Sequence, residues 1–148
     1  MNNPLHPFTV HFPIALLLMS GLFTFIHLRR NLPQLETSAY HCLIAGWIGA
    51  AVAVVSGVID AVRQFVGPEA ARDPAVLVWV NGHAALGIAT LIVYGNLLLQ
   101  RRRNPNLLAN PATRRRYLTN HIIGAILLLL SGWLGGHLVY QLGLGRFA

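Results

Sequence analysis

"FTVHFPIALLLMSGLFTFIHL", residues 8–28, contains no aspartate, glutamate, lysine or arginine. A transmembrane helix takes roughly 20 mostly apolar residues, because it rises about 1.5 Å per residue through a hydrocarbon core of about 30 Å. Within that core, only a helix or a closed barrel satisfies every backbone hydrogen bond. This stretch therefore predicts a membrane-spanning helix.

Three further stretches are similarly apolar: residues 40–62, in which Asp60 is the single charged residue, 76–99 and 120–140. The chain of 148 residues is 55% hydrophobic and 10% charged, with a mean hydropathy of +0.56. A soluble domain carries about 25% charged residues. The predicted fold class is all-α: a polytopic membrane protein with four transmembrane helices in a bundle, forming one domain over residues 1–148.

Arginine gathers in two of the three links between the predicted helices. Arg29 and Arg30 lie in the first link, and the third link holds Arg101, Arg102, Arg103, Arg114, Arg115 and Arg116. Loops rich in arginine stay on the cytoplasmic side, so both termini are predicted to face outward. The arginines of the third link are predicted to meet anionic lipid headgroups, and no nucleic acid is expected as a partner.

Small and polar residues recur at helical spacing in three of the predicted helices. The stripes are Gly46, Gly49, Ala53, Ser56 and Asp60; His83, Gly87, Thr90 and Tyr94; and His121, Ala125, Gly132 and Gly135. Small residues let membrane helices approach closely. These stripes are therefore predicted to face the interior of the bundle.

Histidines on the inward side lie near predicted helix ends. His27, His41 and His121 each fall within about one turn of such an end, where an imidazole can reach headgroups and water. We expect these three to be interfacial. His137, on the outward side, falls off the stripe of its helix and is predicted to face away from the interior.

Four ionisable residues gather on the outward side: His6, His11, Asp60 and His83. An ionisable group within a membrane indicates a functional site, because burying it in hydrocarbon is costly. Imidazoles from different helices can ligate haem iron axially, or bind zinc or copper directly. The predicted cofactor is a b-type haem with His11 and His83 as its axial ligands, supported by His6 and Asp60.

Other readings of this outward cluster stay open. The same side chains could bind a metal ion without haem, or hydrogen-bond a quinone in an apolar slot. Cys42 is the single cysteine, which excludes an intrachain disulfide and covalent c-type haem attachment. No hydrolase, metalloprotease or phosphate-loop motif is present, so we expect no catalytic activity of the chain's own.

Several motifs resemble the bacterial membrane family called domain of unknown function 2231. They are "LHPFTVHFPIALLL" (5–18), "GVID" (57–60), "NGHAALG" (81–87) and "GGHLVYQLG" (135–143). The motif residues carried over are His6, Pro7, His11, Pro13, Asp60, His83, Gly135, Gly136 and Tyr140. Leu142 departs from the pattern, which often has a histidine there. The resemblance implies a four-helix domain that occurs beside Rieske-type or cytochrome c-type domains.

The function expected from residues and resemblance together is a small subunit of an electron-transfer or redox complex. Its location would be the bacterial inner membrane, with periplasmic termini, and its partners other membrane or periplasmic redox subunits. The alternative is a non-catalytic structural or assembly subunit that binds lipid or pigment. Glycine-rich helix faces and the absence of catalytic motifs favour that alternative.

Overall fold

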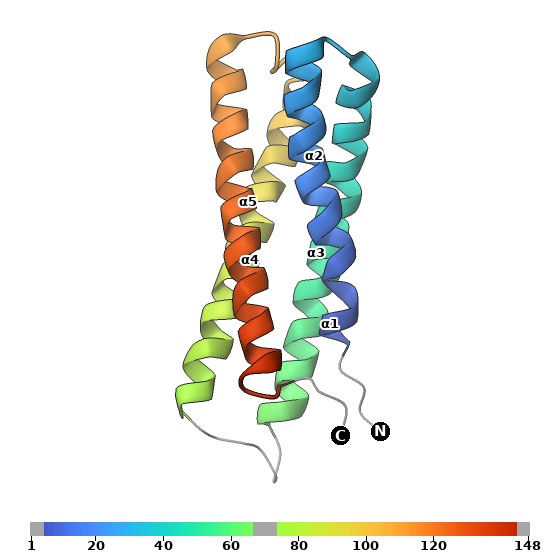
Figure 1. The fold of residues 1–148 in the computed structure, drawn as a ribbon. Helices are drawn as coiled ribbons and strands as arrows, with labels where there is room; N and C mark the ends of the chain where they lie inside the picture. Colours follow the sequence, from blue (N-terminus) through green and yellow to red (C-terminus); the bar gives the residue numbers. More distant parts are fainter. Residues whose placement is uncertain (1–4, 67–73, 145–148) are drawn as a thin grey trace.

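The computed structural model describes residues 5–66 and 74–144, and every regular element within these ranges is a helix. The elements are α1 (His6–Thr9), α2 (His11–Arg30), α3 (Pro33–Phe65), α4 (Pro74–Arg103) and α5 (Pro111–Tyr140). In the bundle, α2 packs along α3 and α4 packs along α5 (Figure 1). The all-α, four-helix architecture is confirmed.

Both described ends of the chain lie at the same end of this bundle, and the α2–α3 and α4–α5 links lie at the other (Figure 1). We name the end that holds α1 the outward end and the opposite one the inward end. The names follow the orientation predicted from arginine, which stays a prediction. The predicted outward loop, residues 67–75, falls mostly outside the described residues.

Four helices are long and apolar enough to cross a membrane: His6–Arg30 taken together, Pro33–Phe65, Pro74–Arg103 and Pro111–Tyr140. The helices exceed the predicted apolar stretches. In particular, α3 and α5 begin at Pro33 and Pro111 rather than near residues 40 and 120. Proline suits a first helical turn, where its missing N–H would have no partner. Helix thus continues through polar residues beyond the apolar stretch.

The first span is divided into α1 and α2 at Val10. Pro13 lacks the N–H that would bond to the carbonyl oxygen of Thr9. Val10 keeps right-handed helical angles, with φ −77° and ψ −30°. The Thr9 hydroxyl hydrogen-bonds to Ser56 Oγ at 2.8 Å, which joins α1 to α3.

The α4–α5 link is shorter than predicted, because both arginine triplets belong to helices. Residues 101–103 end α4, and residues 114–116 lie in the first turns of α5. Within the link, Leu107 and Leu108 are buried. Asn110 caps α5 by accepting a hydrogen bond from the Ala112 amide at 2.9 Å. The link therefore closes the inward end of the core.

Tight packing is concentrated in the inward half of the bundle. The core cluster there consists of Leu17, Leu43, Tyr94, Leu97, Leu107, Leu108, Tyr117 and Leu128. By contrast, no residue between 74 and 89, the outward half of α4, is buried. The α2–α3 and α4–α5 helix pairs, which form two helical hairpins, are therefore less closely packed against each other at the outward end.

The small-residue stripe of α3 faces the interior, as predicted, and the stripe of α4 does so at its inward residues. Gly46, Ala53 and Ser56 are buried on α3, and Thr90 and Tyr94 are buried on α4. The stripe predicted for the last helix is wrong in part.

On α5 the buried residues include His121, Gly124 and Leu128, whereas Gly132 is exposed. A Cβ at Gly132 would meet nothing within 4 Å. The difference follows from the less closely packed outward half, where α5 has fewer neighbours.

We predict that Gly46→Ala destabilises the protein by about 1–3 kcal/mol, the usual effect of overpacking a core. A Cβ at position 46 would lie 2.8 Å from Leu17 Cγ and Cδ2, and Leu17 is fully buried. The measurement is unfolding of the purified protein in mixed detergent micelles. Gly132→Ala is the control and should change stability little. Equal stability of both variants would contradict the described α2–α3 contact.

Candidate functional site

Asp60 holds the short helix α1 against the outward end of α3. Its Oδ2 accepts hydrogen bonds from the backbone amides of Leu5 at 2.7 Å and His6 at 2.8 Å. The first amides of a helix have no partner within it, and a carboxylate satisfies them and complements the helix dipole. Arg63 adds an ion pair to Asp60 at 3.8 Å. Asp60 thus acts on the backbone that carries His6, rather than on an imidazole ring.

The His6 ring is oriented by a backbone carbonyl of α3. Nδ1 of His6 lies 2.8 Å from the Ala53 carbonyl oxygen. A carbonyl only accepts, so Nδ1 carries the hydrogen and donates it. Gly57 makes room for the ring, since a Cβ there would lie 3.0 Å from Nδ1 of His6. The neutral ring therefore carries its lone pair on Nε2.

The His83 ring is held in the same way, by α5. Its Nδ1 lies 3.0 Å from the Ser131 carbonyl oxygen, so Nδ1 again donates. A Cβ at Gly135 would lie 3.1 Å from Cε1 of His83. In the neutral ring the lone pair of His83 is likewise on Nε2.

The two Nε2 atoms face each other at 3.3 Å. The ring centroids are 5.5 Å apart and the ring planes cross at 78°. The centroid separation exceeds the nitrogen separation by about two ring radii, so both nitrogens lie close to the line between the rings. Two opposed lone pairs do not hydrogen-bond to each other. The arrangement suits a cationic centre between them, either a proton or a metal ion.

The structure brings His6, and not His11, to His83. His11 is exposed, and its Nδ1 lies 3.0 Å from the Pro7 carbonyl oxygen of the preceding turn. Among residues 5–66 and 74–144, no three histidine, cysteine, aspartate or glutamate side chains are grouped to hold a metal ion. His6, His11, Asp60 and His83 therefore do not converge as one ligand set, and the site is a pair.

Two aromatic side chains of the outward half do not contact the ring pair closely. Phe12 is 67% exposed. Trp79 packs on His137, with ring centroids 4.5 Å apart. His137 is half-buried within this contact. About one turn along α4 from His83, the Gly87 position is open, since a Cβ there would meet nothing within 4 Å.

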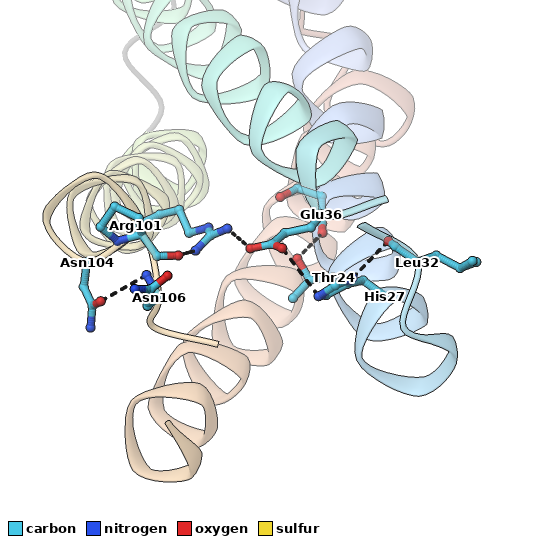
Figure 2. A network of polar contacts seen from close by, with 9 residues as sticks. Thr24, His27, Leu32, Glu36, Arg101, Asn104 and Asn106 are labelled. Atoms are coloured by element: carbon cyan, nitrogen blue, oxygen red, sulfur yellow. Dashed lines mark hydrogen bonds and ion pairs between the residues drawn. The ribbon is translucent and has the colours of Figure 1, made fainter. Parts of the chain in front are cut away.

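At the inward end, a network of polar side chains links α2, α3 and α4 (Figure 2). His27 Nδ1 donates to the Leu32 carbonyl oxygen at 2.9 Å, and its Nε2 lies 3.6 Å from Glu36 Oε2. Glu36 also pairs with Arg101, which in turn bonds to the Pro105 carbonyl oxygen. The Arg101 side chain is only 13% exposed. Arg101, which was predicted with the other link arginines to meet headgroups, is thus engaged inside the protein.

The inward histidines differ from one another. His41 is exposed, as expected for an interfacial residue, and His27 belongs to the network just described. The interfacial prediction for His121 is wrong. Because α5 begins at Pro111, His121 lies nearly three turns inside the helix, and it is 5% exposed. Neither of its ring nitrogens has a hydrogen-bond partner among the described residues.

A family model described as "Predicted membrane protein (DUF2231)" matches residues 2–147 of the chain. No curated protein and no solved structure matches the chain. The matched residues include the four motifs at 5–18, 57–60, 81–87 and 135–143.

We predict that Glu36→Gln destabilises the protein by about 1–3 kcal/mol, because it leaves the poorly exposed Arg101 guanidinium without its charged partner. Arg102→Gln is the control, because Arg102 is exposed and follows Arg101 at the end of α4. This variant should change stability little. Unfolding in mixed micelles at low and high salt is the measurement. A Glu36→Gln variant as stable as the control would contradict the role of this network.

Proposed function

The chain belongs to the family of predicted membrane proteins termed DUF2231, and on that premise we propose that it is a small integral membrane subunit of an electron-transfer or redox complex. In this proposal His6 and His83 hold a b-type haem at the outward end. The supporting observation is the pair of Nε2 atoms that face each other at 3.3 Å. When bound there, a haem would supply one-electron transfer.

Both rings present an unprotonated Nε2, the kind of imidazole nitrogen that would hold haem iron. Each ring already donates through Nδ1 to a carbonyl, Ala53 for His6 and Ser131 for His83. Such a bond fixes the tautomer and direction of a ligating histidine.

The surroundings of the pair also suit a flat, apolar group. The outward half of α4 has no buried residue between 74 and 89. Gly87 lies about one turn from His83, with nothing within 4 Å of its Cβ position. In this proposal the α2–α3 and α4–α5 helix pairs separate at the outward end to admit the group, while the tightly packed inward half keeps them together.

In this proposal the partners are other membrane or periplasmic redox subunits at the outward end and anionic lipids at the inward end. Arg102, Arg103, Arg115 and Arg116 are exposed there. Their charge favours anionic headgroups. The bacterial inner membrane, with periplasmic termini, is the proposed location.

His6→Ala and His83→Ala are each predicted to abolish the reduced-minus-oxidised haem bands of protein purified after haem-replete expression. His11→Ala should retain them, because the His11 ring is exposed and does not face His83. Loss of the bands in His11→Ala with retention in His6→Ala would contradict the pairing and restore the His11–His83 alternative. A wild-type protein without haem bands would contradict haem binding itself, and would favour the non-catalytic structural subunit.

Asp60 is a positioning residue in this proposal, since it caps the helix that carries His6. Asp60→Ala is predicted to weaken haem binding about 10- to 100-fold, the usual effect of removing support from a metal ligand. Arg63→Gln, which removes only the ion pair at 3.8 Å, is the control. Haem titration of both variants measures the effect. Equal affinities would show that Asp60 does not position His6.

A further inference from the structure

A groove lies at the inward end of α2, on a face whose residues are exposed or half-buried. It measures about 510 Å³ and is lined by Phe25, Ile26, Arg29 and Arg30. Clefts that hold small ligands measure roughly 300–1,000 Å³. Arg29 and Arg30 are the last two residues of the helix, and the two apolar residues lie about one turn before them. The groove therefore joins a cationic end to an apolar one.

The Arg29 guanidinium lies over the ring of Phe25. Its Cζ atom is 5.1 Å from the ring centroid, within the range of a cation–π contact. A guanidinium on the face of an aromatic ring keeps its N–H donors at its edge, where they can bind phosphate oxygens. The donors of the groove are thus partly oriented by the protein itself.

The positive charge of this groove is not neutralised by a carboxylate of the described residues, which include only Glu36 and Asp60. Both oxygens of Glu36 are engaged in the network at the inward end, and Asp60 lies at the outward end. Arg29 and Arg30 are exposed and form no ion pair in this part of the chain. Their charge therefore favours an anion from outside the chain.

The apolar part of the groove continues along an exposed side of α2. Leu22 is 48% exposed and Phe25 is 50% exposed, and they follow one another at helical spacing. Arg29 lies at the end of a candidate membrane span, and at 1.5 Å per residue Leu22 is about 10 Å deeper along the axis. A free phosphate would use only the arginines, whereas a phospholipid would use both parts of the groove.

We propose that this groove binds one anionic phospholipid, with its phosphate group on Arg29 and Arg30 and an acyl chain along Leu22 and Phe25. Basic residues near the membrane surface attract anionic headgroups. A zwitterionic lipid is disfavoured, because it brings an ammonium group that the two arginines repel. The site is separate from the arginines at the ends of α4 and α5. It depends neither on haem binding nor on which side of the membrane the inward end faces.

The test is titration of the purified protein in neutral detergent with phosphatidylglycerol, followed by native mass spectrometry. One phosphatidylglycerol molecule is expected to bind in preference to phosphatidylcholine. Arg29→Gln and Arg30→Gln should each weaken this binding roughly 5-fold, the attraction expected of one basic residue. Arg63→Gln, which removes the same charge at the outward end of α3, is the control. Equal binding of the two lipids, or equal affinity of the three variants, would overturn the proposal.

The aromatic part of the groove is tested separately. Phe25→Leu keeps an apolar side chain but removes the ring under Arg29, and it should weaken phosphatidylglycerol binding roughly 2- to 5-fold, as for an exposed cation–π contact. Phe12→Leu, at an exposed ring near the other end of α2, is the control. Equal affinity of these two variants would overturn the groove as the site. Displacement of the lipid by inorganic phosphate at constant ionic strength would overturn the lipid assignment, because phosphate alone would then suffice.

Discussion

The opposed imidazoles of His6 and His83 are the interaction on which the outward half of the structure depends. Each ring is held through Nδ1 by a carbonyl of a packed helix, Ala53 on α3 and Ser131 on α5. This arrangement leaves both Nε2 lone pairs pointing at one another, 3.3 Å apart. Lone pairs so placed repel unless a cation lies between them. A membrane interior makes such an arrangement costly, which is why we connect it with function.

The rest of the fold supplies what this pair requires. The inward half is closed by apolar packing and by the network of His27, Glu36 and Arg101. The outward half carries few buried residues, so its helices are joined more by polar contacts, such as those of Asp60 with α1, than by packing. The chain has only four acidic residues, and the two in its described helices, Glu36 and Asp60, each hold one end of the bundle.

The sequence predicted the four spans well, because within lipid a long apolar stretch with at most one charged residue can satisfy its backbone hydrogen bonds as a helix. Helix ends were predicted less well. Pro33 and Pro111 begin their helices several residues before the apolar stretches, since polar residues continue a helix beyond hydrocarbon. That difference explains the wrong prediction for His121, which apolarity placed near a helix end and the structure places in the core.

The pairing at the site was harder to predict for a similar reason. His11 and His6 are separated by the break at Val10, and the capping of α1 by Asp60 holds the His6 backbone against α3. In the sequence, only the aspartate of "GVID" pointed to this pairing. Its partners are the backbone amides of Leu5 and His6, and sequence patterns do not reveal such contacts. Gly57 and Gly135 make room for the two rings, but this role can be recognised only once the positions of the helices are known.

The central claim is that both rings are Nδ1–H tautomers whose Nε2 atoms face one another. Its most direct measurement is the ¹⁵N spectrum of His6 and His83 in the haem-free protein at alkaline pH, where both imidazoles are neutral. We predict a protonated Nδ1 and an unprotonated Nε2 in both residues. A hydrogen on Nε2 of either ring would contradict the account, because that ring could then donate to its neighbour and no cationic centre would be required.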